Sequence, residues 1–209
     1  MFESSIAVID WLGIVAFTIT GALVASRNQM DVVGFVLLGT VTGIGGGTIR
    51  DLLLNVHPIL WIEHPEYLAV CIGVSVVAFF TVHRVHSRMR VILWVDALGL
   101  ALFATVGAER AISVGVAPLV AIVMGVITAC FGGIIRDLLG QARSIIFSYE
   151  IYVTAAMGAA ATFVALHSME FGRETAVVAG VAVGFALRAG ALLWGWSLPR
   201  YRARPPKDN

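Results

Sequence analysis

Seven long runs of apolar residues, separated by short polar segments, divide the chain. A helix rises about 1.5 Å per residue and the hydrocarbon core of a bilayer is about 30 Å thick, so we interpret each run as one membrane-spanning helix. The pattern predicts an all-α, polytopic membrane protein with seven transmembrane helices. The runs are Ile6–Ser26, Val32–Leu54, Tyr67–Val82, Val91–Val114, Pro118–Leu139, Ile151–His167 and Thr175–Trp196.

Composition supports this interpretation. Of the 209 residues, 59% are hydrophobic and 13% charged, and the mean hydropathy is +0.91. This leaves too little polar surface to cover a water-soluble globule. The formal net charge of +1 argues against a nucleic-acid partner. We expect a single transmembrane domain over residues 1–209.

The chain contains an internal duplication with a shift of 86 residues. Aligning Asp10–Leu53 with Asp96–Leu139 without gaps keeps 16 of 44 positions identical. Repeat one covers about residues 6–82 and repeat two about residues 91–167, each with three helices. An odd number of helices per repeat predicts that the two copies are inverted in the membrane. A seventh helix, about 175–196, and a basic tail, 197–209, lie outside the duplication.

Basic residues predict the orientation. They gather in the loop between the third and fourth runs and in the tail, whereas the opposite loops offer only Arg110 and Arg173. The positive-inside rule makes the basic side cytoplasmic, with the N-terminus outside and the C-terminus inside. Contact between the tail and anionic membrane lipids is a weaker alternative. The basic residues are Arg84, Arg88, Arg90, Arg200, Arg202, Arg204 and Lys207.

A glycine cluster occurs in the second helix of each repeat, as Gly45, Gly46 and Gly47 in the first and Gly132 and Gly133 in the second. Glycine destabilises a helix interior by about 1 kcal/mol relative to alanine. We therefore expect these helices to kink or unwind, which would expose backbone carbonyls that can bind a dehydrated cation. The inverted repeat would bring both breaks together near the midplane. This predicts an ion path between them.

Close helix packing is the alternative explanation for the glycines. Small residues spaced by four allow helix backbones to approach, and both repeats contain such a series. The triple glycine favours a pathway in addition to packing. The two series are Gly39, Gly43 and Gly47, and Gly125, Ala129 and Gly133.

An Arg-Asp pair follows each cluster, as Arg50 with Asp51 and Arg136 with Asp137. Neighbours on a helix point about 100° apart, so we expect each to pair elsewhere. The inverted symmetry permits two patterns. Either the repeats exchange partners, giving Arg50 with Asp137 and Arg136 with Asp51, or the arginines pair with two further duplicated aspartates. A structural network and direct contact with an ion are both open roles.

The further duplicated aspartates are Asp10 and Asp96. Their matched positions favour a shared inward site, with a helix cap or a membrane-edge position as the alternative. Arg188 falls about halfway along the seventh run and is a candidate gate or electrostatic plug. Cys71 and Cys130 have no metal-type spacing and are interpreted as packing residues. The sequence predicts no cofactor, resident metal or enzyme activity.

The repeat, the motif and the seventh helix resemble the prokaryotic branch of the trimeric intracellular cation channel (TRIC) family. The resemblance covers essentially the whole chain. It implies a homotrimer in the inner membrane, with a pore in each subunit between the broken second and fifth helices that passes potassium and sodium. By this resemblance the glycines are the pore-helix breaks, and the two Arg-Asp pairs lie beside the constriction. Phe131 stands where repeat one has Gly45, a departure from symmetry that would narrow one half.

A secondary transporter of glycine or another small zwitterion is the second hypothesis. Inverted repeats with broken helices are common in transporters, and the same family has been labelled as carrying glycine. A substrate carboxylate would meet an arginine or a helix N-terminus, and its ammonium would meet Asp51 or Asp137. A non-conducting scaffold is a third class.

Overall fold

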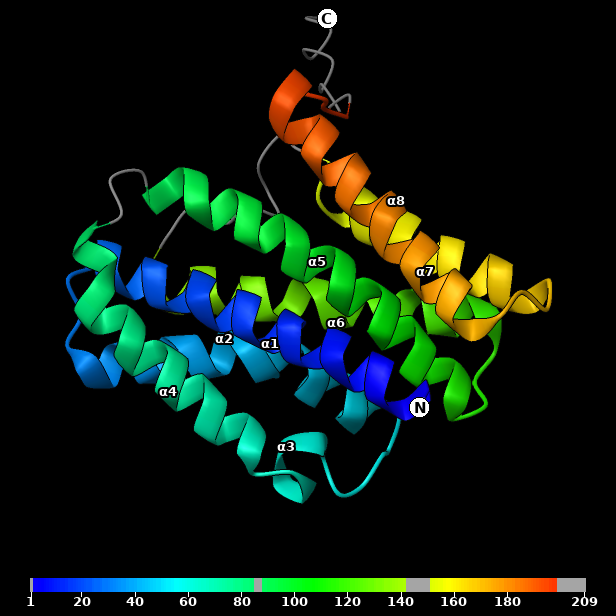
Figure 1. Ribbon diagram of the computed structural model, residues 1–209, viewed down its shortest axis with the longest axis horizontal. Helices are drawn as coiled ribbons and strands as arrows, with labels where there is room; N and C mark the ends of the chain where they lie inside the picture. The colour runs from blue at the N-terminus through cyan, green and yellow to red at the C-terminus, as the bar shows by residue number, and fades with distance from the viewer. Residues whose placement is uncertain (1, 85–87, 142–150, 199–209) are drawn as a thin grey trace, which may run out of the picture.

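The computed structural model describes residues 2–84, 88–141 and 151–198, and every regular element within them is helical (Figure 1). Seven apolar helices coincide with the seven predicted runs, so the predicted fold class is confirmed. Two short elements, α3 and η1, flank α4. The elements are α1 (Phe2–Arg27), α2 (Val32–Leu53), α3 (Leu60–Glu63), α4 (Glu66–Thr81), η1 (Val82–Arg84), α5 (Arg88–Ser113), α6 (Pro118–Leu139), α7 (Val153–Ser168) and α8 (Arg173–Trp194).

Six of these helices are long and apolar enough to cross a membrane, α4 together with η1. The seventh, α7, has 16 residues and is shorter. Local signals fix several ends. Asp31 caps α2 by accepting a 2.8 Å hydrogen bond from the Gly34 amide. Pro118 begins α6, where its missing amide hydrogen costs nothing. Gly195, with φ +67°, ends α8 in the left-handed region.

The two repeats are inverted, and their equivalent helices pack antiparallel. In Figure 1, α1 and α5 lie side by side and run in opposite directions. The contacts between them obey the shift of 86 residues. The Phe103 ring covers Gly13, the Phe17 ring covers Gly99, and the two rings meet edge to face with centroids 5.1 Å apart. This aromatic pair lies on the pseudo-two-fold axis.

The second helices of the two repeats, α2 and α6, cross through the same axis. A methyl group on Gly46 would lie 2.0 Å from the Thr128 carbonyl oxygen, and one on Gly132 would lie 2.5 Å from the Thr42 carbonyl oxygen. Only glycine permits so close an approach. Close helix packing therefore occurs at two glycines that lie outside the predicted series of small residues spaced by four. The helices α4 and α7 flank this central group, and α8 packs on α5 and α7.

The expected unwinding at the glycine clusters is wrong. Both α2 and α6 are continuous α-helix through all of these glycines. The cost of glycine in a helix is small beside the packing that the missing side chains allow, so the helices remain intact. Backbone carbonyls are consequently not released as cation ligands at this point.

Candidate functional site

The two Arg-Asp pairs lie at opposite ends of the α2–α6 crossing. Arg50 and Asp51 occupy the last turn of α2, and Arg136 and Asp137 the last turn of α6. Since the helices are antiparallel and cross near residues 44 and 130, Arg50 and Asp137 are separated along the axis by about 13 residue rises, or roughly 20 Å. The exchanged pairing of Arg50 with Asp137 and Arg136 with Asp51 is therefore wrong.

Each arginine instead bonds to the aspartate that follows it. Arg50 donates from Nε at 2.9 Å and from Nη2 at 2.8 Å to Asp51 Oδ1. Arg136 donates from Nε to Asp137 Oδ1 at 2.9 Å. All four residues are buried. The expectation that neighbours do not pair is wrong because the long arginine side chain folds across the 100° between them, which neutralises both charges locally.

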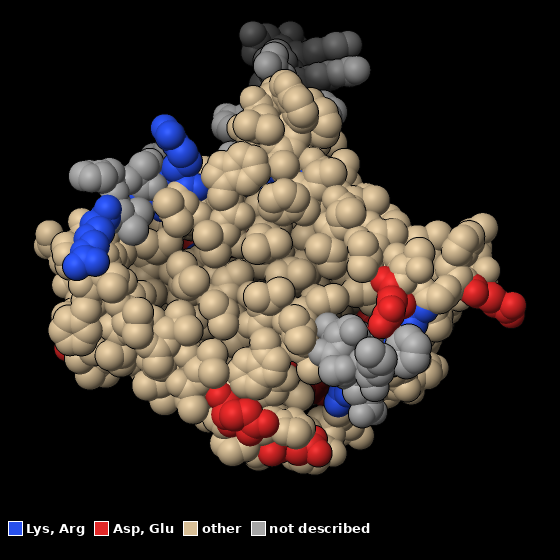
Figure 2. Space-filling view, viewed as in Figure 1, with Lys and Arg blue, Asp and Glu red and all other residues tan. Residues whose placement is uncertain are grey.

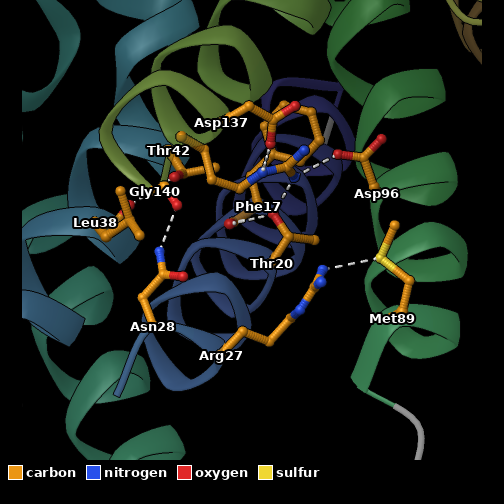
Figure 3. A network of polar contacts seen from close by, with 11 residues as sticks. Phe17, Thr20, Arg27, Asn28, Leu38, Thr42, Met89, Asp96, Asp137 and Gly140 are labelled. Carbon is orange, nitrogen blue, oxygen red and sulfur yellow. Dashed lines mark hydrogen bonds and ion pairs between the residues drawn. The ribbon is translucent and has the colours of Figure 1, made fainter. Parts of the chain in front are cut away.

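Arg136 also makes the predicted contact with the duplicated aspartate of its own repeat. Its Nη1 donates to Asp96 Oδ1 at 2.6 Å and to the Thr20 hydroxyl oxygen at 3.0 Å. Arg136 and Asp96 are fully buried, so Asp96 faces the protein interior. Figure 3 shows Asp96 on α5 pointing toward Thr20 and Asp137. One guanidinium thus joins α6 to α5 and α1.

Asp10 is the counterpart of Asp96 but has different surroundings. It lies inside α1, which excludes a capping role. It interacts with the hydroxyl of Tyr67, and the Arg50 charge is close to it, yet no ion pair joins these two described residues. Asp10 and Arg50 instead line the same cavities.

Two adjoining cavities extend from the end of α2 toward the α2–α6 crossing. The wider has about 910 Å³ of empty volume and the narrower about 350 Å³. They share Asp10, Arg50, Leu60 and Tyr67. The wider cavity adds Ala7, His64, Val106, Glu109, Arg110, Ser113 and Arg173. The narrower adds Ile14, Gly43, Ile44, Gly47, Thr48, Asp51, Ile59, Trp61, Phe103 and Thr128.

The glycines of the two clusters have different positions. Gly47 lines the narrower cavity, and Gly46 touches α6. A methyl group on Gly45 would meet only the end of the Ile135 side chain, at 3.2 Å. Gly132 touches α2, whereas Gly133 faces the Tyr152 hydroxyl and the Arg136 guanidinium. The clusters therefore combine helix packing with space for the arginines.

Arg188 lies fully buried in α8, with its guanidinium carbon 5.2 Å from the centroid of the Tyr152 ring. This cation–π contact connects the seventh helix to the Asp96 region, because Tyr152 also interacts with Asp96. Tyr67 and Tyr152 were not among the residues predicted from the sequence. Their spacing of 85 residues, one less than the repeat shift, was an available signal.

Other polar contacts surround the wider cavity. Glu109 of α5 accepts a hydrogen bond from Arg173, the first residue of α8. Asp51 Oδ2 accepts from the Leu60 amide at 3.3 Å, and Trp61 Nε1 donates to the Thr48 hydroxyl at 3.0 Å. These bonds hold α3 over the end of α2. Among the described residues, no group of three or more His, Cys, Asp or Glu side chains could hold a metal ion.

Charge is unevenly distributed over the outside of the molecule. Figure 2 shows basic side chains near the end of α1 and the start of α5, and acidic side chains near α3 and the far end of α7. Most of the visible surface between them is uncharged. Apolar residues such as Val33, Leu119 and Val178 are well exposed, as expected for surfaces that face lipid.

The fold and site define the class of this protein: a polytopic, all-α membrane protein with an inverted three-helix repeat and buried charges around a polar cavity. A sequence profile for the family described as "Glycine transporter" matches residues 7–83 and 93–168. A UPF0126 membrane protein of Vibrio cholerae is 37% identical and covers 95% of this chain and 83% of its own. The UPF0126 inner membrane protein YadS of Escherichia coli is also 37% identical, over 92% of this chain and 94% of its own.

Solved structures agree with these relatives. The TRIC trimeric intracellular cation channel orthologue from Rhodobacter sphaeroides has a TM-score of 0.91 and 54% identity, over 92% of this chain and 100% of that one. A second structure, from work on conductance through TRIC cation channels, has a TM-score of 0.86 and 30% identity, over 96% of this chain and 98% of that one. The chain belongs to the prokaryotic TRIC family, and it is not an enzyme.

Proposed function

We propose that this protein is a cation channel in which each subunit has its own pathway between α2 and α6. The observation that carries the proposal is the pair of cavities leading from the end of α2, past Asp10 and Arg50, to the helix crossing. The similar solved proteins, described as TRIC cation channels, support it. All twelve candidate residues named from the sequence, Arg188 included, belong to this proposed pathway or to its supporting network.

Carboxylates at the cavity would recruit cations. Asp10 and Glu109 line the wider cavity, and negative charge on low-dielectric walls raises the local cation concentration. Three arginines also line this cavity, Arg50, Arg110 and Arg173. Two of them are partly neutralised, since Arg50 binds Asp51 and Arg173 binds Glu109. Deeper in, Thr48 and Thr128 line the narrower cavity. Their hydroxyls donate to carbonyls one turn earlier, so their oxygen lone pairs can serve as cation ligands.

Monovalent cations, potassium and sodium, are the proposed permeant ions. Hydroxyl and single carboxylate oxygens suit weakly held ions that must leave again. We further propose a homotrimer in a prokaryotic inner membrane, in contact with membrane lipids. The end bearing Arg27, Arg84, Arg88 and Arg90 would be cytoplasmic under the positive-inside rule. This orientation puts the N-terminus outside and the C-terminus inside, with the wider cavity opening outward.

Transport of glycine is the second candidate, after the description of the matching family. A cavity lined by both carboxylates and guanidiniums also fits a zwitterion. A carrier saturates at low turnover and exchanges substrate across the membrane, whereas a channel gives discrete unitary currents. A scaffold would give neither.

Single-channel recording of purified protein in planar bilayers under a potassium chloride gradient tests the proposal. We expect discrete currents that reverse near the potassium equilibrium potential and that Asp10→Asn reduces. Glu170→Gln, which removes an exposed carboxylate outside the cavities, is the matched control. No current from folded protein, together with saturable glycine counterflow in vesicles, would replace the channel with a carrier.

A further inference from the structure

The arginines of the two repeats occupy equivalent positions on their helices. Arg50 and Arg136 each donate from Nε to the following aspartate at 2.9 Å. Each side chain also folds back over the glycine three residues earlier. A methyl group on Gly47 would lie 3.8 Å from Arg50 Nη2, and one on Gly133 would lie 3.6 Å from Arg136 Nη2. The two guanidiniums thus start from the same local geometry.

Their further partners differ. Arg136 binds Asp96 at 2.6 Å and Thr20 at 3.0 Å, and these three residues form what we call the α6 lock. All three are fully buried. The lock ties the last turn of α6 to both α5 and α1. It lies at the end of the α2–α6 crossing opposite the cavities.

The shift of 86 residues identifies the corresponding partners of Arg50. They are Asp10, the counterpart of Asp96, and Val106, the counterpart of Thr20. Arg50, Asp10 and Val106 all line the wider cavity, and no ion pair joins the arginine to this aspartate. These three positions form the α2 lock, which is open in this structure.

We propose that Thr20 and Val106 set which end of the pathway is closed. The pathway conducts when Arg136 releases Asp96 while Arg50 stays unbound from Asp10, and it closes at the cavity end when Arg50 binds Asp10. The two locks open and close separately, because each repeat can adopt the arrangement of the other. The α6 lock is favoured because Thr20 gives Arg136 a hydroxyl acceptor, which Val106 does not give Arg50. This inference names the gate of the pathway proposed above and rests on that proposed function.

The Thr20 hydroxyl is oriented so that its oxygen can accept a hydrogen bond from Arg136. Thr20 donates to the Phe17 carbonyl at 2.8 Å, so its oxygen lone pairs accept from Arg136. Phe103, the counterpart of Phe17, precedes Val106 by the same three residues, so its carbonyl takes the place of the Phe17 carbonyl. A threonine substituted for Val106 therefore has a ready acceptor for its proton. Valine and threonine have nearly the same shape, so both exchanges change only the hydroxyl's two hydrogen bonds, one to a backbone carbonyl and one from the arginine, with little change in volume.

The test uses Thr20→Val and Val106→Thr, with Thr105→Val as the matched control. Thr105 is equally buried and also bonds to a backbone carbonyl, at 3.0 Å from Ala101. A hydrogen bond to a charged group shifts an equilibrium about tenfold or more. In potassium recordings Thr20→Val should raise open probability about tenfold, and Val106→Thr should lower it by a similar factor. Thr105→Val should match the unmodified protein.

A second readout does not depend on conduction. Ile44 lines the narrower cavity, so Ile44→Cys, in a chain with its two native cysteines replaced by alanine, reports access from the α2 end. A membrane-impermeant thiol reagent should label it several-fold more slowly when Val106→Thr is added. Thr20→Val should not slow this labelling.

The outcomes separate the two proposals. The gate proposal is overturned, and the channel stands, if the protein conducts but neither variant changes open probability or labelling. The same holds if Thr20→Val and Val106→Thr change open probability in the same direction. If the folded protein gives no current but Val106→Thr still protects the cysteine, the channel proposal is overturned and the locks stand.

Discussion

The glycine clusters allow a direct test of packing against flexibility, because adjacent glycines have different surroundings. A methyl group on Gly46 would lie 2.0 Å from the Thr128 carbonyl oxygen, whereas one on Gly45 would meet only the mobile end of Ile135 at 3.2 Å. Ordinary van der Waals contact requires more than 3.4 Å, so Gly46→Ala must push α2 and α6 apart by about 1 Å or more. Overpacking of this kind costs about 1–3 kcal/mol.

The control substitution should act in the opposite direction. Gly45→Ala removes the helix penalty of glycine and should stabilise α2 by up to about 1 kcal/mol. The assay is thermal unfolding of purified protein in detergent, followed by loss of the monodisperse peak in size-exclusion chromatography. We expect Gly46→Ala to lower the midpoint by several degrees and Gly45→Ala to leave it equal or higher. Equal destabilisation by both variants would refute the packing argument and support a need for helix flexibility at the whole cluster.

Three further predictions use the same preparation. Asp96→Asn weakens a charged hydrogen bond of Arg136, which keeps its pair with Asp137, and should destabilise the fold by about 1.5–3 kcal/mol, measured by the same unfolding assay. Glu109→Gln breaks the contact with Arg173, a residue with 43% of its side chain exposed, so stability should change by less than about 1 kcal/mol; potassium conductance should nevertheless fall, more at low than at high ionic strength. Cys71 is fully buried, so a maleimide should label it only at the rate of unfolding.

Hydropathy predicted the helices well because each of the seven runs must satisfy its own backbone hydrogen bonds in lipid. The inverted topology also followed from the sequence, since three helices per repeat leave no other choice. The contacts between helices could be predicted in part from the sequence. Glycines at matched positions indicated the α2–α6 crossing, and the structure assigns the tightest contacts to Gly46 and Gly132.

The ion pairs were harder to predict because they depend on distance along two antiparallel helices. Symmetry alone permitted Arg50 with Asp137, and only the position of the crossing shows that their separation is too large. Pairing of Arg136 with Asp96 was one of the two expected patterns and is present. The equivalent pairing of Arg50 with Asp10 is absent, because inverted repeats with the same sequence motif can adopt different local arrangements.

The bonds between sequence neighbours explain why the buried Arg-Asp motif of each repeat destabilises the folded protein only slightly. A lone guanidinium inside the membrane is expensive, and a lock that opened would leave one behind. Since Arg50 and Arg136 each keep a carboxylate on the adjacent residue, the charge stays paired whether or not the aspartate on α1 or α5 is bound. An arginine has five N–H groups, so it can hold its neighbour and still bind a second partner. The motif is therefore suited to a contact that forms and breaks, and replacing the neighbouring aspartate should abolish folding more readily than replacing Asp10.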